Sequence, residues 1–245
     1  MNSQNRIAIV TGASRGIGAA IAQRLAADGH TVVINYAGNA ADAERLAATI
    51  EKAGGHAISA QADVSDPNAV TRLFDAAEAA FGGVDVLVNN AGIMKLSSIA
   101  ESDDALFDSQ IAINLKGTFN AMRLAARRLR DGGRIVNLST SVVGLKLENY
   151  SVYAATKAAV ETLTAIASKE LRGRSITVNA IAPGPTATDL FLNGKSPELI
   201  ERLSRMNPLE RLGTPADIAN AVAFLVGPDG GWINGQVLRA NGGMI

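Results

Sequence analysis

The chain has 245 residues, of which 47% are hydrophobic, and its 23 basic and 23 acidic side chains give a formal net charge of zero. This length predicts one large α/β domain over residues 1–245, and the balanced charge offers no basic field for nucleic acid or a membrane surface. The absence of cysteine excludes disulfide bonds and thiolate metal sites, and it favours a cytoplasmic protein. The N-terminus is polar, and no apolar run is long enough to span a bilayer.

A glycine-rich turn follows the first predicted strand. Residues 7–10 are apolar, as in a strand buried on both faces, and apolar residues recur at helical spacing from Ile17. A phosphate-binding loop needs a tight turn, as at Gly12, close approach of the backbone, as at Gly16, and close helix packing, as at Gly18. We therefore expect cofactor contacts from Gly12, Ser14, Arg15, Gly16, Ile17 and Gly18.

The second predicted strand, residues 31–36, ends without an acidic residue. Sites that prefer NAD usually place a carboxylate there to bind the ribose 2′-hydroxyl, whereas a guanidinium such as that of Arg15 can bind a 2′-phosphate. The sequence therefore predicts NADP(H) as the cofactor, with an ordinary solvated Arg15 as the alternative. The candidate contacts at this strand end are Asn35, Tyr36, Ala37, Gly38 and Asn39.

Two further strand ends supply candidate cofactor contacts. A weak strand at residues 57–61 precedes Asp63 and Val64, which we expect near an adenine. Residues 84–88 form an apolar strand, and the small residues and amides after it suit either close approach to a ribose or a stabilising turn. The candidates in this second group are Asn90, Ala91 and Gly92.

A long helical region at residues 103–130 contains an unusual residue. Asn114 lies among apolar residues, where an amide costs free energy to bury unless it is paired; a capped or solvated amide is the alternative to a functional one. The arginines near the end of this region, from Arg123 to Arg130, are expected on a solvated face. His30 and His56 belong to no ligand-like cluster and are expected to be ordinary surface or turn residues, so no metal site is predicted.

The candidate acid–base group lies in a helix predicted at residues 151–172. Tyr153 and Lys157 are four residues apart and share one helix face. A nearby cation favours the phenolate and lowers the pKa of a tyrosine, which can then exchange a proton with an alcohol or carbonyl while a hydride moves elsewhere. A strand at residues 134–138 precedes three candidate hydroxyls, Ser139, Thr140 and Ser141.

The last part of the chain completes the predicted architecture. A strand at residues 176–181 is followed by an apolar segment at about 186–213, which we expect to be a mobile substrate lid, with a fixed surface excursion as the alternative. A helix at 215–226 and a strand at 236–238 come after it. Strands alternate with helices throughout, which predicts one doubly wound α/β domain whose seven-stranded, mostly parallel sheet carries helices on both faces.

Together these motifs resemble the short-chain dehydrogenase/reductase family along the whole chain. Residues 11–18 have its T-G-x-x-x-G-x-G form, and residues 89–92 read N-N-A-G. Its helix asparagine, its catalytic pair and its post-strand turn are matched by Asn114, by Tyr153 with Lys157, and by Pro183-Gly184. The nearest resemblance is to 3-oxoacyl-[acyl-carrier-protein] reductases and fungal naphthol reductases, which implies a Rossmann-type fold and a homotetramer.

The resemblance also implies roles for single residues. Tyr153 would be the general acid/base, Lys157 would lower its pKa and bind the nicotinamide ribose, and Asn114 would hold a water that links Lys157 to solvent. A hydroxyl after the fifth strand would hold the substrate oxygen; the family commonly has serine where this chain has Thr140, which leaves Ser139, Thr140 and Ser141 open. The residues expected to face the nicotinamide are Pro183, Gly184, and Thr186 or Thr188.

The predicted reaction is reversible hydride transfer between NADP(H) and a carbonyl or secondary alcohol, such as a 3-oxoacyl compound or a similar ketone. The apolar lid favours a partly or wholly apolar small-molecule substrate, and no nucleic-acid or membrane partner is predicted. One alternative is a non-catalytic NADP(H)-binding sensor, which would be free to lose Tyr153 or Lys157. Another is a nucleotide-sugar epimerase or dehydratase, which usually carries a larger C-terminal substrate domain.

Overall fold

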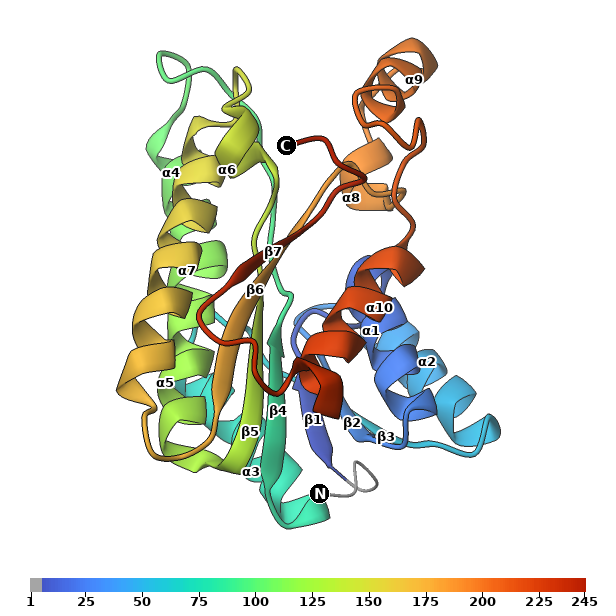
Figure 1. Ribbon diagram of the computed structural model, residues 1–245, viewed down its shortest axis with the longest axis vertical. Helices are drawn as coiled ribbons and strands as arrows, with labels where there is room; N and C mark the ends of the chain where they lie inside the picture. Colours follow the sequence, from blue (N-terminus) through green and yellow to red (C-terminus); the bar gives the residue numbers. More distant parts are fainter. Residues whose placement is uncertain (1–5) are drawn as a thin grey trace.

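A seven-stranded sheet runs through the molecule in the order β3-β2-β1-β4-β5-β6-β7 (Figure 1). Every neighbouring pair of strands is parallel, so the sheet predicted as mostly parallel is parallel throughout. The computed structural model describes residues 6–245, and the polar N-terminal residues 1–5 lie outside them. The strands are β1 Ile7–Val10, β2 Thr31–Tyr36, β3 His56–Gln61, β4 Val84–Asn89, β5 Leu129–Leu138, β6 Thr177–Pro183 and β7 Val237–Ala240.

Helices cover both faces of this sheet, as predicted. Helices α1, α2 and α10 pack on one face, and α3, α5 and α7 pack on the other (Figure 1). These six are α1 Gly16–Ala27, α2 Ala40–Lys52, α3 Pro67–Phe81, α5 Thr118–Arg128, α7 Ser151–Glu170 and α10 Pro215–Val226. The shorter ones are α4 Asp104–Gln110, α6 Val142–Leu145, α8 Asp189–Leu192, α9 Pro197–Ser204 and a 3₁₀ turn, η2 Pro228–Gly230.

The two cores follow from the alternation of side chains along buried strands. In β1, Ala8 and Val10 point into the core under α1, α2 and α10, whereas Ile7 and Ile9 point into the core under α3, α5 and α7. Each large apolar side chain removed from water in this way contributes roughly 1.5–3 kcal/mol. The strands that read as continuous apolar runs are therefore the ones buried on both faces.

The order of the strands reverses at β1, which pairs with β2 on one side and with β4 on the other. In doubly wound sheets a crevice opens at such a reversal, beyond the carboxyl ends of the strands, because the two chain directions lead away from each other there. The segments that leave β1, β2 and β4 at this edge are those in which the sequence analysis found its glycines and amides.

The helix predicted at residues 103–130 is not continuous. Its middle, Ile111–Gly117, is a π-helix between α4 and α5, and its last two predicted residues belong to β5. A π-helical stretch is rare and is often found at functional sites. Asn114, the unusual amide of this region, lies inside it.

Two basic residues are less exposed than expected. His30, expected as an ordinary surface or turn residue, lies in the turn between α1 and β2 but is buried with 4% of its area exposed, because it leads directly into the buried strand β2. Arg128, predicted on a solvated face, forms ion pairs with Asp75 and Glu78 on α3, which lies beside α5. Neither partner of Arg128 is near it in the sequence, so spacing alone did not indicate the pairs.

Candidate active site and cofactor groove

The glycine loop between β1 and α1 has a backbone that side chains tolerate poorly. Gly12 and Gly16 have φ of 60° and 58°, in the left-handed region that favours glycine. A Cβ on Gly18 would lie 2.4 Å from the Asn90 amide nitrogen, so only glycine fits there. Helix α1 starts directly after the loop, and no side chain caps its first N–H groups. These groups and the positive end of the helix dipole are suited to an anionic ligand.

Polar side chains from two neighbouring strands hold this loop. The Asn35 side chain accepts a hydrogen bond from the Gly12 N–H at 3.1 Å and donates to the Ala62 carbonyl at 3.0 Å. The Asn90 amide donates to the carbonyls of Thr11 and Gly12 at 2.9 and 3.0 Å. Both asparagines were predicted as cofactor contacts; they line the groove, and their side chains also shape the loop.

A groove continues from the glycine loop along the ends of β2, β3 and β4. Its lining includes all predicted cofactor residues of these segments, and Thr188 closes it from the side of the lid. Ala62, which precedes Asp63, and Asp189 and Leu190 of the expected lid also line it, and Ile93 and Ile113 are lining residues that the sequence did not indicate. The predicted ones are Gly12, Ser14, Arg15, Gly16, Ile17, Gly18, Asn35, Tyr36, Ala37, Gly38, Asn39, Asp63, Val64, Asn90, Ala91 and Gly92.

The end of the groove beside β2 has the charges that the sequence predicts for NADP(H): a guanidinium from Arg15 and no carboxylate at the strand end. Arg15 is exposed and forms no ion pair within residues 6–245, so its guanidinium is available to a ligand. Asn39 is the N-cap of α2, where its side chain accepts a hydrogen bond from the Asp42 N–H. Asp42 itself pairs with Arg45 and does not line the groove.

Tyr153 and Lys157 project from the first turns of α7 into a second cavity, which shares Ile17, Asn90 and Gly92 with the groove. The Thr140 hydroxyl forms a hydrogen bond with the Tyr153 hydroxyl. The Lys157 ammonium nitrogen lies 6.0 Å from the centre of the Tyr153 ring and donates to the Leu138 carbonyl at 2.7 Å. The structure thus brings a phenol, an amine and a hydroxyl to one wall of this cavity.

Burial controls the protonation of this pair. It raises the pKa of Tyr153 to about 12, against the lowering effect of the Thr140 hydrogen bond. It also lowers the pKa of Lys157 to about 8. The expectation that the lysine depresses the pKa of the tyrosine therefore does not describe this state, because loss of hydration has the largest effect on the phenol. The neutral phenol is the stable form at neutral pH.

The three hydroxyls after β5 point in different directions. Ser139 donates to a carboxylate oxygen of Glu161 on α7 at 2.6 Å. Ser141 donates to the Ala182 carbonyl at 3.1 Å and accepts from the Asn241 amide at 2.9 Å. Thr140, between them, is the residue whose hydroxyl meets Tyr153. All three line the cavity, but only Thr140 pairs with the phenol.

Asn114 is fully buried and its side chain is hydrogen-bonded at both ends. Its oxygen accepts from the Ile93 N–H at 2.8 Å, and its amide donates to the Ile93 carbonyl at 2.9 Å and to the Thr156 hydroxyl at 3.3 Å. A Cβ on Gly92 would lie 3.2 Å from this oxygen and 3.6 Å from the Lys157 nitrogen. Asn114 thus fixes the chain after β4 beside Lys157, which explains a buried helix amide.

The remainder of the second cavity is apolar. It measures about 990 Å³, including the part open to solvent, and Lys157 is the one charged residue in its lining. Pro183, Gly184, Thr186 and Thr188, predicted to face a nicotinamide, line the same cavity. Leu190, Phe191 and Met206 in this lining come from the apolar segment expected to be a lid. The lining residues that the sequence did not indicate include Met94, Val142, Leu145, Leu147, Tyr150 and Met244.

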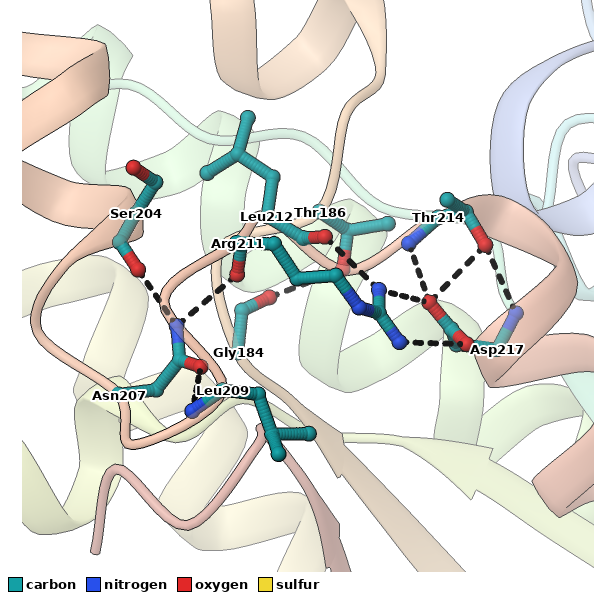
Figure 2. A network of polar contacts seen from close by, with 9 residues as sticks. All are labelled: Gly184, Thr186, Ser204, Asn207, Leu209, Arg211, Leu212, Thr214 and Asp217. Carbon is teal, nitrogen blue, oxygen red and sulfur yellow. Dashed lines mark hydrogen bonds and ion pairs between the residues drawn. The ribbon is translucent and has the colours of Figure 1, made fainter.

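The two ends of the segment expected to be a lid pair with each other. Thr186 pairs with Gly213 as an isolated parallel bridge, and Ala187 N–H donates to the Gly213 carbonyl at 2.8 Å. Figure 2 shows the contacts that brace the second half of the segment, where the Asn207 amide donates to the carbonyls of Ser204 and Arg211. Arg211 then pairs with Asp217 in the first turn of α10. Within this segment α8 and α9 lie beyond the strand ends (Figure 1).

The residues present fit a dinucleotide. Two glycines have left-handed φ, a third leaves no room for a Cβ, and the start of α1 has no capping side chain. The exposed Arg15 lies on the same groove, and the groove leads to the buried amine of Lys157. A 2′-phosphorylated nucleotide would place its anionic groups at these donors.

Comparison with known proteins agrees with this geometry. A family model described as enoyl-(acyl carrier protein) reductase matches residues 12–245. A short-chain type dehydrogenase/reductase of Picea abies is 46% identical over 250 residues, covering 98% of this chain and 92% of the relative. An NADPH-dependent aldehyde reductase-like protein of Arabidopsis thaliana is 46% identical over 254 residues, covering 98% and 94%. The chain therefore belongs to the short-chain dehydrogenase/reductase family.

Solved structures show the same fold over the whole chain. A short-chain dehydrogenase of Burkholderia cenocepacia in complex with NADP is 40% identical, with a TM-score of 0.94, covering 100% of this chain and 99% of the other. An angucycline C-6 ketoreductase with bound NADP is 36% identical, with a TM-score of 0.94, covering 99% and 96%. The doubly wound Rossmann-type fold predicted from the sequence is confirmed.

Residues 6–245 contain neither a membrane-spanning helix nor a metal-binding cluster. No helix there is both long and apolar enough to cross a membrane. No group of three or more histidine, cysteine, aspartate or glutamate side chains is arranged to hold a metal ion in that part of the chain.

Proposed function

We propose that this chain is an NADP(H)-dependent carbonyl reductase in which Tyr153 exchanges a proton with the substrate. Membership of the short-chain dehydrogenase/reductase family makes it an NADP-dependent oxidoreductase, and relatives crystallised with NADP support this cofactor. One observation carries the proposal. The Tyr153 hydroxyl, hydrogen-bonded by Thr140, lines an apolar cavity that opens into the groove of the glycine loop.

The cofactor residues follow from the groove. The N–H groups at the start of α1 would hold the pyrophosphate, Arg15 would bind the 2′-phosphate, and Asp63 and Val64 would flank the adenine. Lys157, with a buried amine, would bind the nicotinamide ribose, and Pro183, Gly184, Thr186 and Thr188 would face the nicotinamide. The absence of a carboxylate at the end of β2 supports NADP(H) over NAD(H).

The proton chemistry belongs to this chain's own residues. Bound NADPH supplies the hydride. The Tyr153 phenol, which stays protonated at neutral pH, donates its proton to the carbonyl oxygen of the substrate, and Thr140 holds that oxygen. Asn114 keeps the chain after β4 in place beside Lys157, and a water bound near it would carry the replacement proton. We assign the substrate-binding hydroxyl to Thr140, because Ser139 and Ser141 are engaged elsewhere.

The substrate is an uncharged ketone or aldehyde with a large apolar body. The cavity lining offers methionine, leucine, valine and aromatic side chains and no cation besides Lys157. A charged substrate would lose its hydration there without a partner. The names of an aldehyde reductase-like relative and a ketoreductase neighbour support this substrate class. A 3-oxoacyl compound is a second candidate, supported by the family model's description.

Three wider features are part of the proposal. Residues 186–213 form a lid over the apolar cavity, because Leu190, Phe191, Leu203 and Met206 of this segment line it. Residues 1–245 act as one catalytic domain, and copies of the chain assemble as a homotetramer. We also propose a cytoplasmic location.

The test is an NADPH-against-NADH oxidation screen over aromatic ketones, quinones, keto esters, aldehydes and 3-oxoacyl thioesters. Turnover of apolar ketones or aldehydes with NADPH, at several times the rate with NADH, is the expected result. Tight NADPH binding with no turnover of any carbonyl would instead support the non-catalytic sensor. A rate with 3-oxoacyl thioesters well above that with ketones would reject the substrate class.

A further inference from the structure

A row of polar contacts joins the end of β5 to one face of α7. Thr140 meets Tyr153, Leu138 accepts from Lys157 at 2.7 Å, and Ser139 donates to Glu161 at 2.6 Å. Tyr153, Lys157 and Glu161 stand four residues apart in succession, on one side of the helix. The row continues deeper, where the Asn137 amide donates to Thr164 at 2.9 Å.

We propose that Glu161 is a positioning residue: by binding Ser139 it fixes Thr140 against Tyr153. The proposal rests on the catalytic role of Tyr153 proposed above and extends it to a residue two turns further along α7. Within residues 6–245, Glu161 forms no hydrogen bond with Tyr153 or Lys157. It acts through Ser139, the residue before Thr140.

Packing alone does not explain why a carboxylate lies against Ser139. Ser139 is buried, with 4% of its area exposed, and Glu161 is half-buried. Glu161 forms no ion pair within residues 6–245, and the Ser139 hydroxyl is its side chain's hydrogen-bond partner there. Desolvating a carboxylate with no cation beside it costs free energy, so an apolar residue would fill this place more favourably.

Apart from Lys157, which donates to the Leu138 carbonyl at the end of β5, the other hydrogen bonds that support this loop come from the opposite side. The N–H groups of Ser139 and Ser141 donate to the carbonyls of Ile181 and Pro183 at 2.7 and 2.8 Å, and the Ser141 hydroxyl donates to Ala182. These bonds hold the loop against β6 but leave its distance from α7 undetermined. Glu161 sets that distance on the helix side, one residue away from Thr140. Small displacements of a proton-transfer pair lower the rate strongly.

The experiment compares Glu161→Ala with Glu161→Gln, which keeps an oxygen that can accept from Ser139. For Glu161→Ala we expect kcat to fall by roughly 10- to 100-fold, while KM for NADPH stays within about twofold. Glu161→Gln should restore most of kcat. Ser139→Ala should lower kcat like Glu161→Ala, and the double variant should be no worse than either, because both remove one contact. Glu170→Ala, an exposed acid on the same helix, is the matched control.

A second readout needs no turnover. The chain has three tyrosines, so ultraviolet titration of the free protein, compared with Tyr153→Phe, isolates the ionisation of Tyr153. Since the hydrogen bond from Thr140 lowers the pKa of Tyr153, its loss in Glu161→Ala should raise that pKa above the wild-type value, with Tyr150 and Lys157 unchanged beside it.

The outcomes separate this proposal from the proposed function. If wild-type protein reduces no carbonyl, the function fails, and the titration still decides the role of Glu161. The positioning role is rejected if Glu161→Ala titrates and turns over like the wild type. It is also rejected if Glu161→Gln is as impaired as Glu161→Ala, because then the charge rather than the hydrogen bond is needed.

Discussion

At the scale of single residues, the site depends on a balance between burial and hydrogen bonding. Burial pushes the phenol of Tyr153 toward its neutral form and the amine of Lys157 toward its uncharged form. A neutral phenol is a proton donor, so the protonation state favours carbonyl reduction at neutral pH. Burial of these groups also costs folding free energy. Replacing them should therefore lower activity while it removes a cost to stability.

The first prediction concerns the proton donor. Tyr153→Phe should lower kcat for carbonyl reduction by about 10²- to 10⁴-fold, because it removes the hydroxyl alone. The affinity for NADPH, measured by fluorescence titration, should change little, since the ring stays in place. Retained turnover in this variant would reject Tyr153 as the general acid.

The second prediction concerns the pH dependence of stability. Burial lowers the pKa of Lys157 from 10.5 to about 8, so the unfolded chain binds more protons than the folded one between these values. The free energy of unfolding should therefore rise with pH across this window, by on the order of 3 kcal/mol at most from this residue. Lys157→Met should remove the rise and abolish turnover. Denaturant unfolding at several pH values measures the rise in the free energy of unfolding. An equal rise in Lys157→Met would show that Lys157 is not its source.

The third prediction concerns cofactor choice. Arg15→Ala should weaken NADPH binding about 10- to 100-fold, because a charge-assisted hydrogen bond to a phosphate contributes roughly 1.5–3 kcal/mol. NADH lacks that phosphate and should lose far less. Isothermal titration with both cofactors makes the comparison, and equal losses would remove Arg15 from the phosphate site.

At the scale of elements, the glycine loop and the lid are held in different ways. The loop is fixed by buried amides from the neighbouring segments, Asn35 and Asn90. The two ends of the proposed lid pair with each other at the Thr186–Gly213 bridge, Asn207 braces its second half, and Arg211 joins it to Asp217 on α10 (Figure 2). A lid fixed at its base and apolar on its inner side can cover a substrate without carrying catalytic groups.

The fourth prediction tests the contacts of Asn207. Asn207→Ala removes three hydrogen bonds of a buried amide, to Ser204, Leu209 and Arg211, and should cost about 1–3 kcal/mol of stability. The KM for the carbonyl substrate should rise several-fold, whereas the dissociation constant for NADPH should stay nearly unchanged. Arg205→Ala, at an exposed neighbour that pairs with Glu201, is the control and should alter neither quantity. An unchanged KM in Asn207→Ala would argue against a covering role.

At the scale of the whole molecule, apolar side chains remain exposed on the helices that cover one face. Phe119 on α5 and Ile166 on α7 are 45% and 48% exposed, and Leu238 on β7 is 38% exposed. Large apolar side chains left exposed can belong to an association surface. They support the homotetramer inferred from the family resemblance, which stays a prediction.

The fifth prediction addresses that assembly. Ile166→Glu should shift the protein from tetramer to smaller species in sedimentation experiments, because a carboxylate would be desolvated at the contact. Thr49→Glu, an equally exposed change on α2 across the sheet, should leave the assembly intact. A tetramer that survives Ile166→Glu would place the interface elsewhere.

The sequence by itself determined the fold and the outline of the site. Continuous apolar runs such as residues 84–88 mark strands buried on both faces, and alternation with helices then leaves few arrangements. The motifs fell at strand ends, which meet at one edge of a parallel sheet. Spacing along one helix sufficed to place Tyr153 beside Lys157, because helix geometry is local.

Only the tertiary structure decided which side chains face one another across elements. It alone separated Thr140 from Ser139 and Ser141, since their partners come from α7, β6 and the chain after β7. It buried His30 and gave Arg128 two carboxylates from another helix. It also reversed the expected pKa of Tyr153, because the loss of water around a group depends on everything packed against it and is not encoded in any local pattern.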